Sequence, residues 1–161
     1  THRQIAANIR HKATSLMPGY SPPAFSLYDR NRKLVNLQDF KGSYVYLNFC
    51  TCTSYSCFKE YEILQKLNNK YGNTVKFITV ICDGSLDEMI TYLSKNTYNW
   101  IFLNFANQPD VLENYRIKAF PVYLFIDKDG RTLYSPCPTP GENFEGLLEK
   151  LLTKRGELPK N

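Results

Sequence analysis

The sequence contains no long hydrophobic run, few histidines and no regular cysteine spacing. No window approaches the eighteen or more consecutive apolar residues of a membrane-spanning helix, and no signal-peptide pattern is recognisable. The two histidines, His2 and His11, both lie in the first segment. Five cysteines is an odd number, so at least one cannot pair within the chain. These absences argue against a membrane-spanning segment in this chain and against a small domain built on disulfide bonds.

Clustered charge is missing as well. The 20 lysines and arginines outnumber the 15 acidic residues, giving a net charge of +5, but they are scattered along the chain. We interpret the densest basic groups, at residues 3–12 and 30–33, as solvated surface, so binding to nucleic acid is not predicted. With 161 residues and 43% hydrophobic composition, the chain has the size and composition of one domain with its own core.

A buried strand followed by an amphipathic helix is the clearest pattern in the sequence. Residues 44–49 are large apolar and aromatic side chains interrupted only by Asn48, which predicts a central strand. The following helix is expected to bury one face, made of Cys57, Tyr61, Leu64, Leu67 and Tyr71. Polar residues that can cap a helix, Ser54 among them, separate the two elements. Cys57 therefore lies near the positive end of a helix dipole, which favours its thiolate form.

The segment from Leu47 to Glu60 resembles the active-site segment of TlpA/ResA-type thioredoxin-like proteins, which reads roughly L-N-F-W-A-T-W-C-x-x-C-x-x-E. The matching positions are Asn48, Phe49, Thr51, Cys57 and Glu60. Cys50 and Thr53 occupy the two tryptophan positions, and Ser54 replaces the first cysteine of the pair. Because a serine hydroxyl cannot form a mixed disulfide, the usual two-cysteine exchange cannot run through residues 54 and 57.

The resemblance covers residues 20–154 and implies the fold. Further strands are expected at residues 74–82 and 100–103 and within 120–135, and helices are expected at 57–71 and 86–93, after Pro109 and at 144–152. This order indicates the α/β class and a thioredoxin-like fold, with a mixed central sheet, helices on both faces and an N-terminal β-hairpin extension. Residues 1–19 are expected to be a leading helix, over 4–17, or a linker from an upstream segment, and residues 20–161 the thioredoxin-like domain.

Two interpretations remain open for each residue of the degenerate motif. Cys57 is either a reactive thiol or the first residue of a buried helix face. For Ser54 we expect a structural role as helix cap. A serine three residues before a cysteine also resembles the T/S-x-x-C of peroxiredoxins, in which the hydroxyl orients the cysteine that attacks peroxide. The proline that peroxiredoxins carry seven residues before that cysteine is replaced here by Cys50.

Three more residues complete the candidate catalytic set. Cys82 follows the next predicted strand, and it approaches Cys50 at the carboxyl edge of the sheet if the two strands are parallel neighbours. Cys52 precedes the helix and is a further candidate thiol. Buried packing is the default expectation for both Cys50 and Cys82. Asp83 is the nearest acidic residue to the catalytic carboxylate of the TlpA/ResA pattern, although it is one place out of register.

The remaining cysteine is not expected to join this site. Cys137 lies between two prolines and is predicted to be an exposed loop thiol. The spacings C-x-C and C-x4-C do not supply the paired cysteine knuckles of structural zinc sites, so no metal site is predicted. No cofactor is implied by the resemblance either.

The resemblance also implies a substrate edge and a class of function. Phe120-Pro121 resembles the cis-proline corner that faces the active site of thioredoxin-like proteins, and Phe120, Pro121 and Tyr55 are expected to contact an extended substrate. We expect a thiol–disulfide oxidoreductase-related protein with weak or altered redox activity, located in the periplasm or cell envelope. Its partner would be a protein thiol or disulfide, or an extended peptide. The alternatives are a non-catalytic binding module and a single-cysteine peroxidase.

Overall fold

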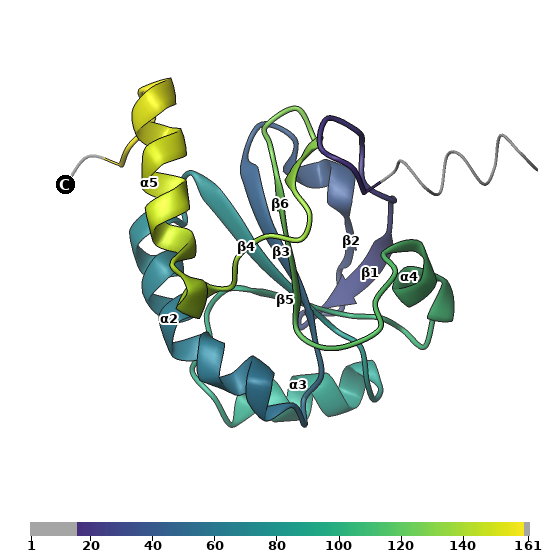
Figure 1. The fold of residues 1–161 in the computed structure, drawn as a ribbon. Helices are drawn as coiled ribbons and strands as arrows, with labels where there is room; N and C mark the ends of the chain where they lie inside the picture. The colour runs from purple at the N-terminus through teal and green to yellow at the C-terminus, as the bar shows by residue number, and fades with distance from the viewer. Residues whose placement is uncertain (1–15, 160–161) are drawn as a thin grey trace, which may run out of the picture.

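A seven-stranded mixed sheet forms the centre of the computed structural model, which describes residues 16–159 (Figure 1). The strands lie in the order β2-β1-β5-β4-β3-β6-β7. Their bounds are β1 Ser26–Asp29, β2 Leu34–Asn36, β3 Tyr44–Cys50, β4 Val75–Ile81, β5 Ile101–Asn104, β6 Val122–Ile126 and β7 Thr132–Tyr134. Strands β3, β4 and β5 are parallel, whereas β6 and β7 on one side and the β1–β2 hairpin on the other are antiparallel.

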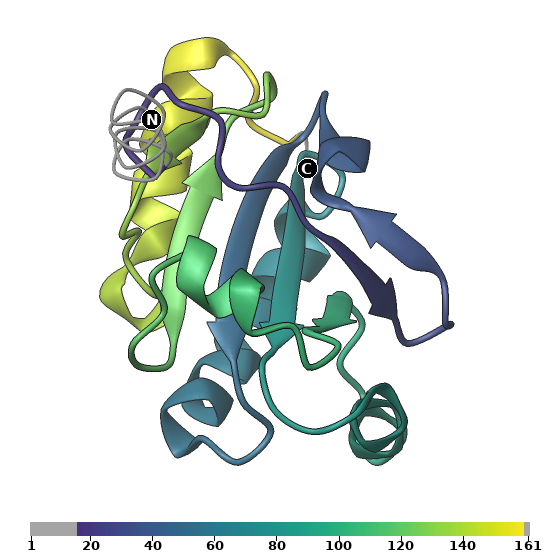
Figure 2. The ribbon, with the colours of Figure 1, turned by 90° about the vertical axis from the view of Figure 1, so that its right-hand side faces the viewer.

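Helices cover both faces of this sheet, as predicted. They are α2 Tyr55–Tyr71, α3 Leu86–Ser94, α4 Pro109–Asn114 and α5 Phe144–Arg155, with short 3-10 helices at Leu37–Phe40 (η1) and Pro140–Glu142 (η2). Helices α2, α3 and α5 pack on one face, and α4 lies on the other, where Figure 2 shows it in front of the strands. The structure thus confirms the predicted mixed α/β architecture and its N-terminal hairpin. The leading helix predicted over 4–17 falls almost entirely outside the described residues.

Strand β3 runs through the middle of the core, and all seven of its residues are buried. Side chains alternate between the two faces of a strand. Tyr46 and Cys50 accordingly pack with α2 and α5, whereas Leu47 and Phe49 pack with the core beneath α4. Burial on both faces explains why the sequence of this strand is an unbroken apolar run and not an alternating one.

Helix α2 buries the face that its sequence pattern predicts. Its buried residues are Cys57, Glu60, Tyr61, Leu64, Leu67 and Tyr71. Tyr61 of this face belongs to an aromatic cluster that continues across Tyr98, Trp100 and Phe102, with ring centroids 4.9–6.0 Å apart. Packing of this size fixes the helix on the sheet and so fixes the residues of its first turn.

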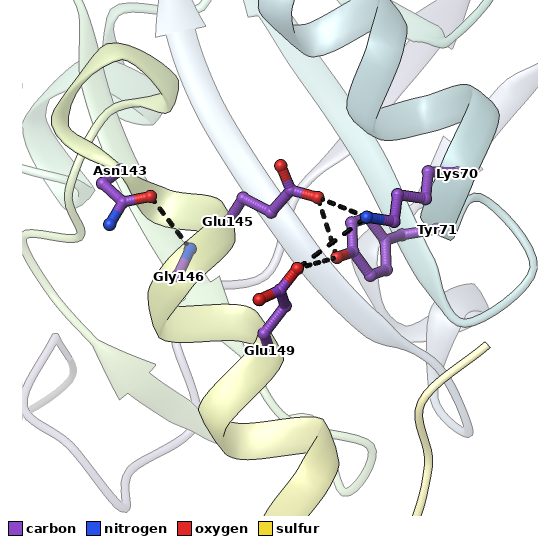
Figure 3. A network of polar contacts seen from close by, with 6 residues as sticks. All are labelled: Lys70, Tyr71, Asn143, Glu145, Gly146 and Glu149. Carbon is purple, nitrogen blue, oxygen red and sulfur yellow. Dashed lines mark hydrogen bonds and ion pairs between the residues drawn. The ribbon is translucent and has the colours of Figure 1, made fainter.

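The far end of α2 is tied to α5 by a polar network (Figure 3). Lys70 Nζ lies 2.9 Å from Glu145 Oε2 and 3.7 Å from Glu149 Oε1, and Tyr71 Oη donates to the same two carboxylates. The ammonium group of Lys70 lowers the pKa of Glu145. These exposed ion pairs add little free energy, but they orient α5 across the end of α2.

None of the helices between residues 16 and 159 combines the length and hydrophobicity that a membrane crossing requires. Helix α3 begins with a capping box: Ser85 Oγ accepts the amide of Glu88, whose carboxylate accepts the amide of Ser85. Helix α5 begins similarly, since Asn143 Oδ1 accepts the amide of Gly146 (Figure 3).

Candidate active site around Cys57

Cys57 is the third residue of α2 and lies directly after the loop that leaves β3. The strand ends at Cys50, residues 51–54 turn the chain, and α2 begins at Tyr55. The side chain of Cys57 is buried, with 0% of the residue exposed. All five cysteines are free thiols in this structure. The loop of residues 51–54 therefore decides what surrounds the Cys57 sulfur.

Three neighbouring polar groups stabilise the thiolate of Cys57. The thiol of Cys50 has the largest effect, and the hydroxyl of Ser54 and the backbone of Thr51 add to it. Hydrogen bonds to a thiolate stabilise the charged form. They outweigh burial and the nearby charge of Asp83, both of which act in the opposite direction, and they lower the pKa of Cys57 to about 7. A large fraction of Cys57 is therefore ionised at neutral pH.

Ser54 does not act as predicted. It occupies the N-cap position of α2, but its side chain makes no capping hydrogen bond. The first amides of the helix, those of Cys57 and Phe58, bond instead to the backbone carbonyl of Ser54, at 3.1 and 3.2 Å. This leaves the hydroxyl free to turn toward the Cys57 sulfur, so the expectation of a side-chain cap was wrong. Its contact is of the kind that orients a reactive cysteine.

Cys50 is a protonated partner of this thiolate. It is the last residue of β3, is 0% exposed, and accepts a weak hydrogen bond of 3.4 Å from Asn48 Nδ2. Burial raises its pKa strongly, and the neighbouring Cys57 sulfur raises it further. Burial and these two thiols also raise the pKa of Tyr61, whose buried Oη has no hydrogen-bond partner among the described residues. Cys50 therefore stays a protonated thiol beside the Cys57 thiolate.

Cys52 and Asp83 hold the loop in place. The amide of Cys52 donates to Asp83 Oδ1 at 2.9 Å, which links the loop to the end of β4. Burial, then Asp83 and Glu88, raise the pKa of the Cys52 thiol to about 12. Cys52 is half-buried, and its thiol stays protonated at neutral pH. Asp83 affects Cys57 only through its charge, which raises the pKa of Cys57.

The backbone of Cys82 lies near the site, but its side chain faces the other side of the sheet. The predicted approach of the strand ends is real, because the amide of Cys82 donates to the carbonyl of Cys50 at 2.8 Å. Ile81 pairs with Cys50, so the next residue turns to the opposite face of the sheet. Cys82 accordingly packs with the core beneath α4, and burial raises its pKa to about 12. Cys82 therefore does not supply a second thiol at the site, and the buried packing expected for it by default is confirmed.

Cys137 is buried, with 5% of the residue exposed, although its flanking prolines led us to expect an exposed loop thiol. Its segment folds back on the sheet, where the amide of Cys137 donates to the carbonyl of Tyr123 at 2.7 Å. The side chain joins the core between the sheet, α2 and α5, and burial raises its pKa to about 12. It is a core residue.

An open groove lies beside the turn that carries Cys57. The Phe120–Pro121 peptide bond is cis, and Val122 pairs with Phe49, which places Pro121 next to the end of β3. The groove holds about 560 Å³ and is lined by Ser56, Lys59, Glu60, Ile63, Phe120, Pro121, Thr139, Gly141 and Glu142. Tyr55, 78% exposed, lies in the same first turn of α2.

Two features of the site were not recognised from the sequence. The Thr51 amide was not predicted to bond to Cys57, because a backbone donor has no sequence signal. Glu60 matched the family pattern but received no role. It is buried, and its Oε2 accepts the amide of Gly141 at 2.8 Å. The carboxylate thus ties the first half of α2 to η2 at the edge of the groove.

Comparison with known proteins agrees with this geometry. Residues 42–132 match a protein-family model described as thioredoxin-like. The thiol-disulfide oxidoreductase ResA of Bacillus thuringiensis subsp. konkukian is 30% identical over 141 residues, which cover 84% of this chain and 77% of that protein.

Solved structures show the same fold. A thiol:disulfide interchange protein from Bacteroides sp. aligns with a TM-score of 0.75 and 25% identity, covering 84% of this chain and 90% of that one. The exposed lipoprotein thioredoxin of Streptococcus pneumoniae strain TIGR4 aligns with a TM-score of 0.66 and 22% identity, over 79% and 99% of the two chains. The family match and the ResA relative together show that this chain belongs to the thioredoxin-like family, in its TlpA/ResA-type group of thiol–disulfide oxidoreductase-like proteins.

Proposed function

We propose that Cys57 is the reactive thiol of this thioredoxin-like domain, and that Ser54 has changed from an attacking position to an orienting one. The proposal is carried by the buried place of Cys57 in the first turn of α2, where the neighbouring Cys50, Ser54 and Thr51 lower its pKa and favour its thiolate near neutral pH. Of the five cysteines, Cys57 alone has a lowered pKa, whereas burial raises the pKa of the other four. The thiolate is the species that attacks a disulfide.

The chemical step is a thiol–disulfide exchange. The Cys57 thiolate attacks one sulfur of a partner disulfide, a new S–S bond forms to that sulfur, and the other partner sulfur leaves as a thiolate. The Ser54 hydroxyl cannot release the partner by attacking this mixed disulfide. Turnover through the usual two positions is therefore blocked, and the redox activity is weak or altered.

The groove beside the cis-proline is the proposed docking site for the partner. Its rim combines the apolar surface of Ile63 with the backbone at Phe120 and Pro121, where an extended peptide can pair with the chain. Cys57 itself is 0% exposed, so a partner disulfide reaches its sulfur only through a local movement at the start of α2.

The proposed partner is a protein thiol or disulfide of the cell envelope. Relatives described as ResA and as an exposed lipoprotein thioredoxin support a location outside the cytoplasm. The same groove would serve a non-catalytic binding module, which differs in one respect: its Cys57 would not exchange with disulfides.

The disulfide reagent DTNB separates these two functions. At about pH 7 the protein is expected to release thionitrobenzoate in a fast phase, because the most ionised thiol reacts first. Cys57→Ser should remove this phase, and the matched control Cys52→Ser should keep it. A fast phase that survives Cys57→Ser, or its absence from the unmodified protein, would contradict the proposal.

A further inference from the structure

We infer that Cys50 is the resolving partner of Cys57, so that the domain carries a buried redox pair separated by six residues in place of the usual C-x-x-C pair. The inference deepens the proposed function and rests on it, because Cys57 must first exchange with a disulfide. Nothing in the degenerate S-x-x-C motif itself supplies a second sulfur.

The geometry brings these two thiols together. Cys50 ends β3 and Cys57 lies in the first turn of α2, and both side chains are fully buried in the same core cluster. The two thiols are close enough to act on each other directly, since Cys50 lowers the pKa of Cys57 and Cys57 raises that of Cys50. A thiol beside the Cys57 sulfur is placed to attack it after Cys57 has formed a mixed disulfide.

The other three thiols do not compete for this position. Cys82 faces the opposite side of the sheet, and the segment of Cys137 is bonded to β6 at Tyr123. Cys52 is the nearest alternative, but its backbone is held by Asp83, and it is only partly buried against the core cluster that contains both Cys50 and Cys57.

The reaction balances with a disulfide as the oxidant. In the first step Cys57 displaces one partner sulfur and remains bonded to the other. In the second step Cys50 loses its proton and its sulfur attacks Cys57 Sγ, so that the Cys50–Cys57 bond forms and the Cys57–partner bond breaks. The departing thiolate takes up that proton. Two cysteine sulfurs lose two electrons in total, and one partner disulfide is reduced to two thiols.

The product would bridge the end of β3 to the start of α2 and close the loop that contains Ser54. Oxidation would also remove the Cys57 thiolate and the donor that stabilises it. The oxidised pair would lie in the core, where external thiols reach it slowly. We therefore expect a redox pair that equilibrates slowly with small thiols such as glutathione.

Mass spectrometry of the full chain tests the inference. The protein is equilibrated with mixtures of oxidised and reduced glutathione, quenched with acid, alkylated and digested with chymotrypsin. Cleavage after Phe49, Tyr55 and Phe58 places Cys57 on one peptide and Cys50 with Cys52 on another. In oxidising mixtures we expect these peptides to be linked, with fragmentation assigning the bond to Cys50 and with the other three thiols alkylated.

Two variants make the result decisive, with circular dichroism confirming that each is folded. Cys52→Ala should keep the linkage, whereas Cys50→Ala should lose it and accumulate a glutathione adduct on Cys57. Linkage through Cys52, or five free thiols in every mixture, would overturn the inference. A stable Cys57–glutathione adduct in the unmodified protein would overturn it while leaving the proposed function intact. Absence of any oxidation at Cys57 would contradict both.

Discussion

Ser54→Cys is expected to raise dithiothreitol-driven reduction of insulin by roughly 10-fold or more. Residue 54 is half-buried at the N-cap of α2, where a thiolate is stabilised by the helix dipole and reachable by a protein disulfide. The Ser54 hydroxyl already contacts Cys57, so a sulfur in its place would lie beside the second cysteine of the family pair. The unmodified protein should show only slow reduction.

Ser56→Cys is the matched control for this gain. Ser56 lies in the same first turn and is exposed on the groove, but it is adjacent to Cys57 in sequence and not three residues before it. The control adds one accessible thiol without creating the family spacing. If the two variants reduce insulin equally fast, the extra thiol and not its position explains the gain, and the assignment of residues 54–57 to the active-site turn is wrong.

Tyr46→Ala is expected to lower the free energy of unfolding by about 3–5 kcal/mol. The Tyr46 ring is fully buried between β3 and α5, stacked on Phe144 with ring centroids 3.7 Å apart. Its Oη donates to the carbonyl of Pro138 at 2.6 Å, which holds the segment of Cys137 against the sheet. Truncation would leave a large cavity and an unpaired buried carbonyl. Urea unfolding followed by circular dichroism measures the loss.

Tyr46→Phe isolates the hydrogen bond from the ring. It keeps the stack on Phe144 and removes only the hydroxyl, so a loss of about 1–2 kcal/mol is expected. Equal losses in the two variants would show that the ring contributes little and that the hydrogen bond carries the effect. A loss below about 1 kcal/mol in Tyr46→Ala would contradict the assigned packing.

Much of the fold could be predicted because its central elements have unambiguous periodicity. The apolar run of β3 is buried on both faces, and the spacing of Cys57, Tyr61 and Leu64 matches the buried face of α2. A short-range signal such as the capping box of Ser85 and Glu88 is likewise readable from sequence, because both partners lie within one turn.

The contacts of the site were less predictable because they depend on how a four-residue loop turns. The strand ends at Cys50, and the direction taken by residues 51–54 brings Ser54 and the Thr51 amide to Cys57. Sequence alone could not choose between a capping and an orienting role for the serine. For Cys82 the sequence left a second site thiol open beside buried packing, because neighbouring strand ends can be close while their side chains face opposite sides of the sheet.

Cys137 shows a different limit. Its two flanking prolines favour a loop, and a loop is usually on the surface. Burial was decided by the way the chain between β7 and α5 returns across β6, bonding Cys137 to Tyr123. That return is a long-range contact, and no local pattern of residues encodes it.

The pH dependence of alkylation at Cys57 tests the central claim most directly. The rate with iodoacetamide, followed on the chymotryptic peptide that contains Cys57 alone, reports the thiolate fraction between about pH 5 and pH 10. Because the pKa of Cys57 is lowered to about 7, the rate should rise through a midpoint near pH 7 and level off above it. A midpoint at about pH 8.5 or higher, as for an ordinary cysteine, or no labelling of Cys57 at any pH, would contradict the account.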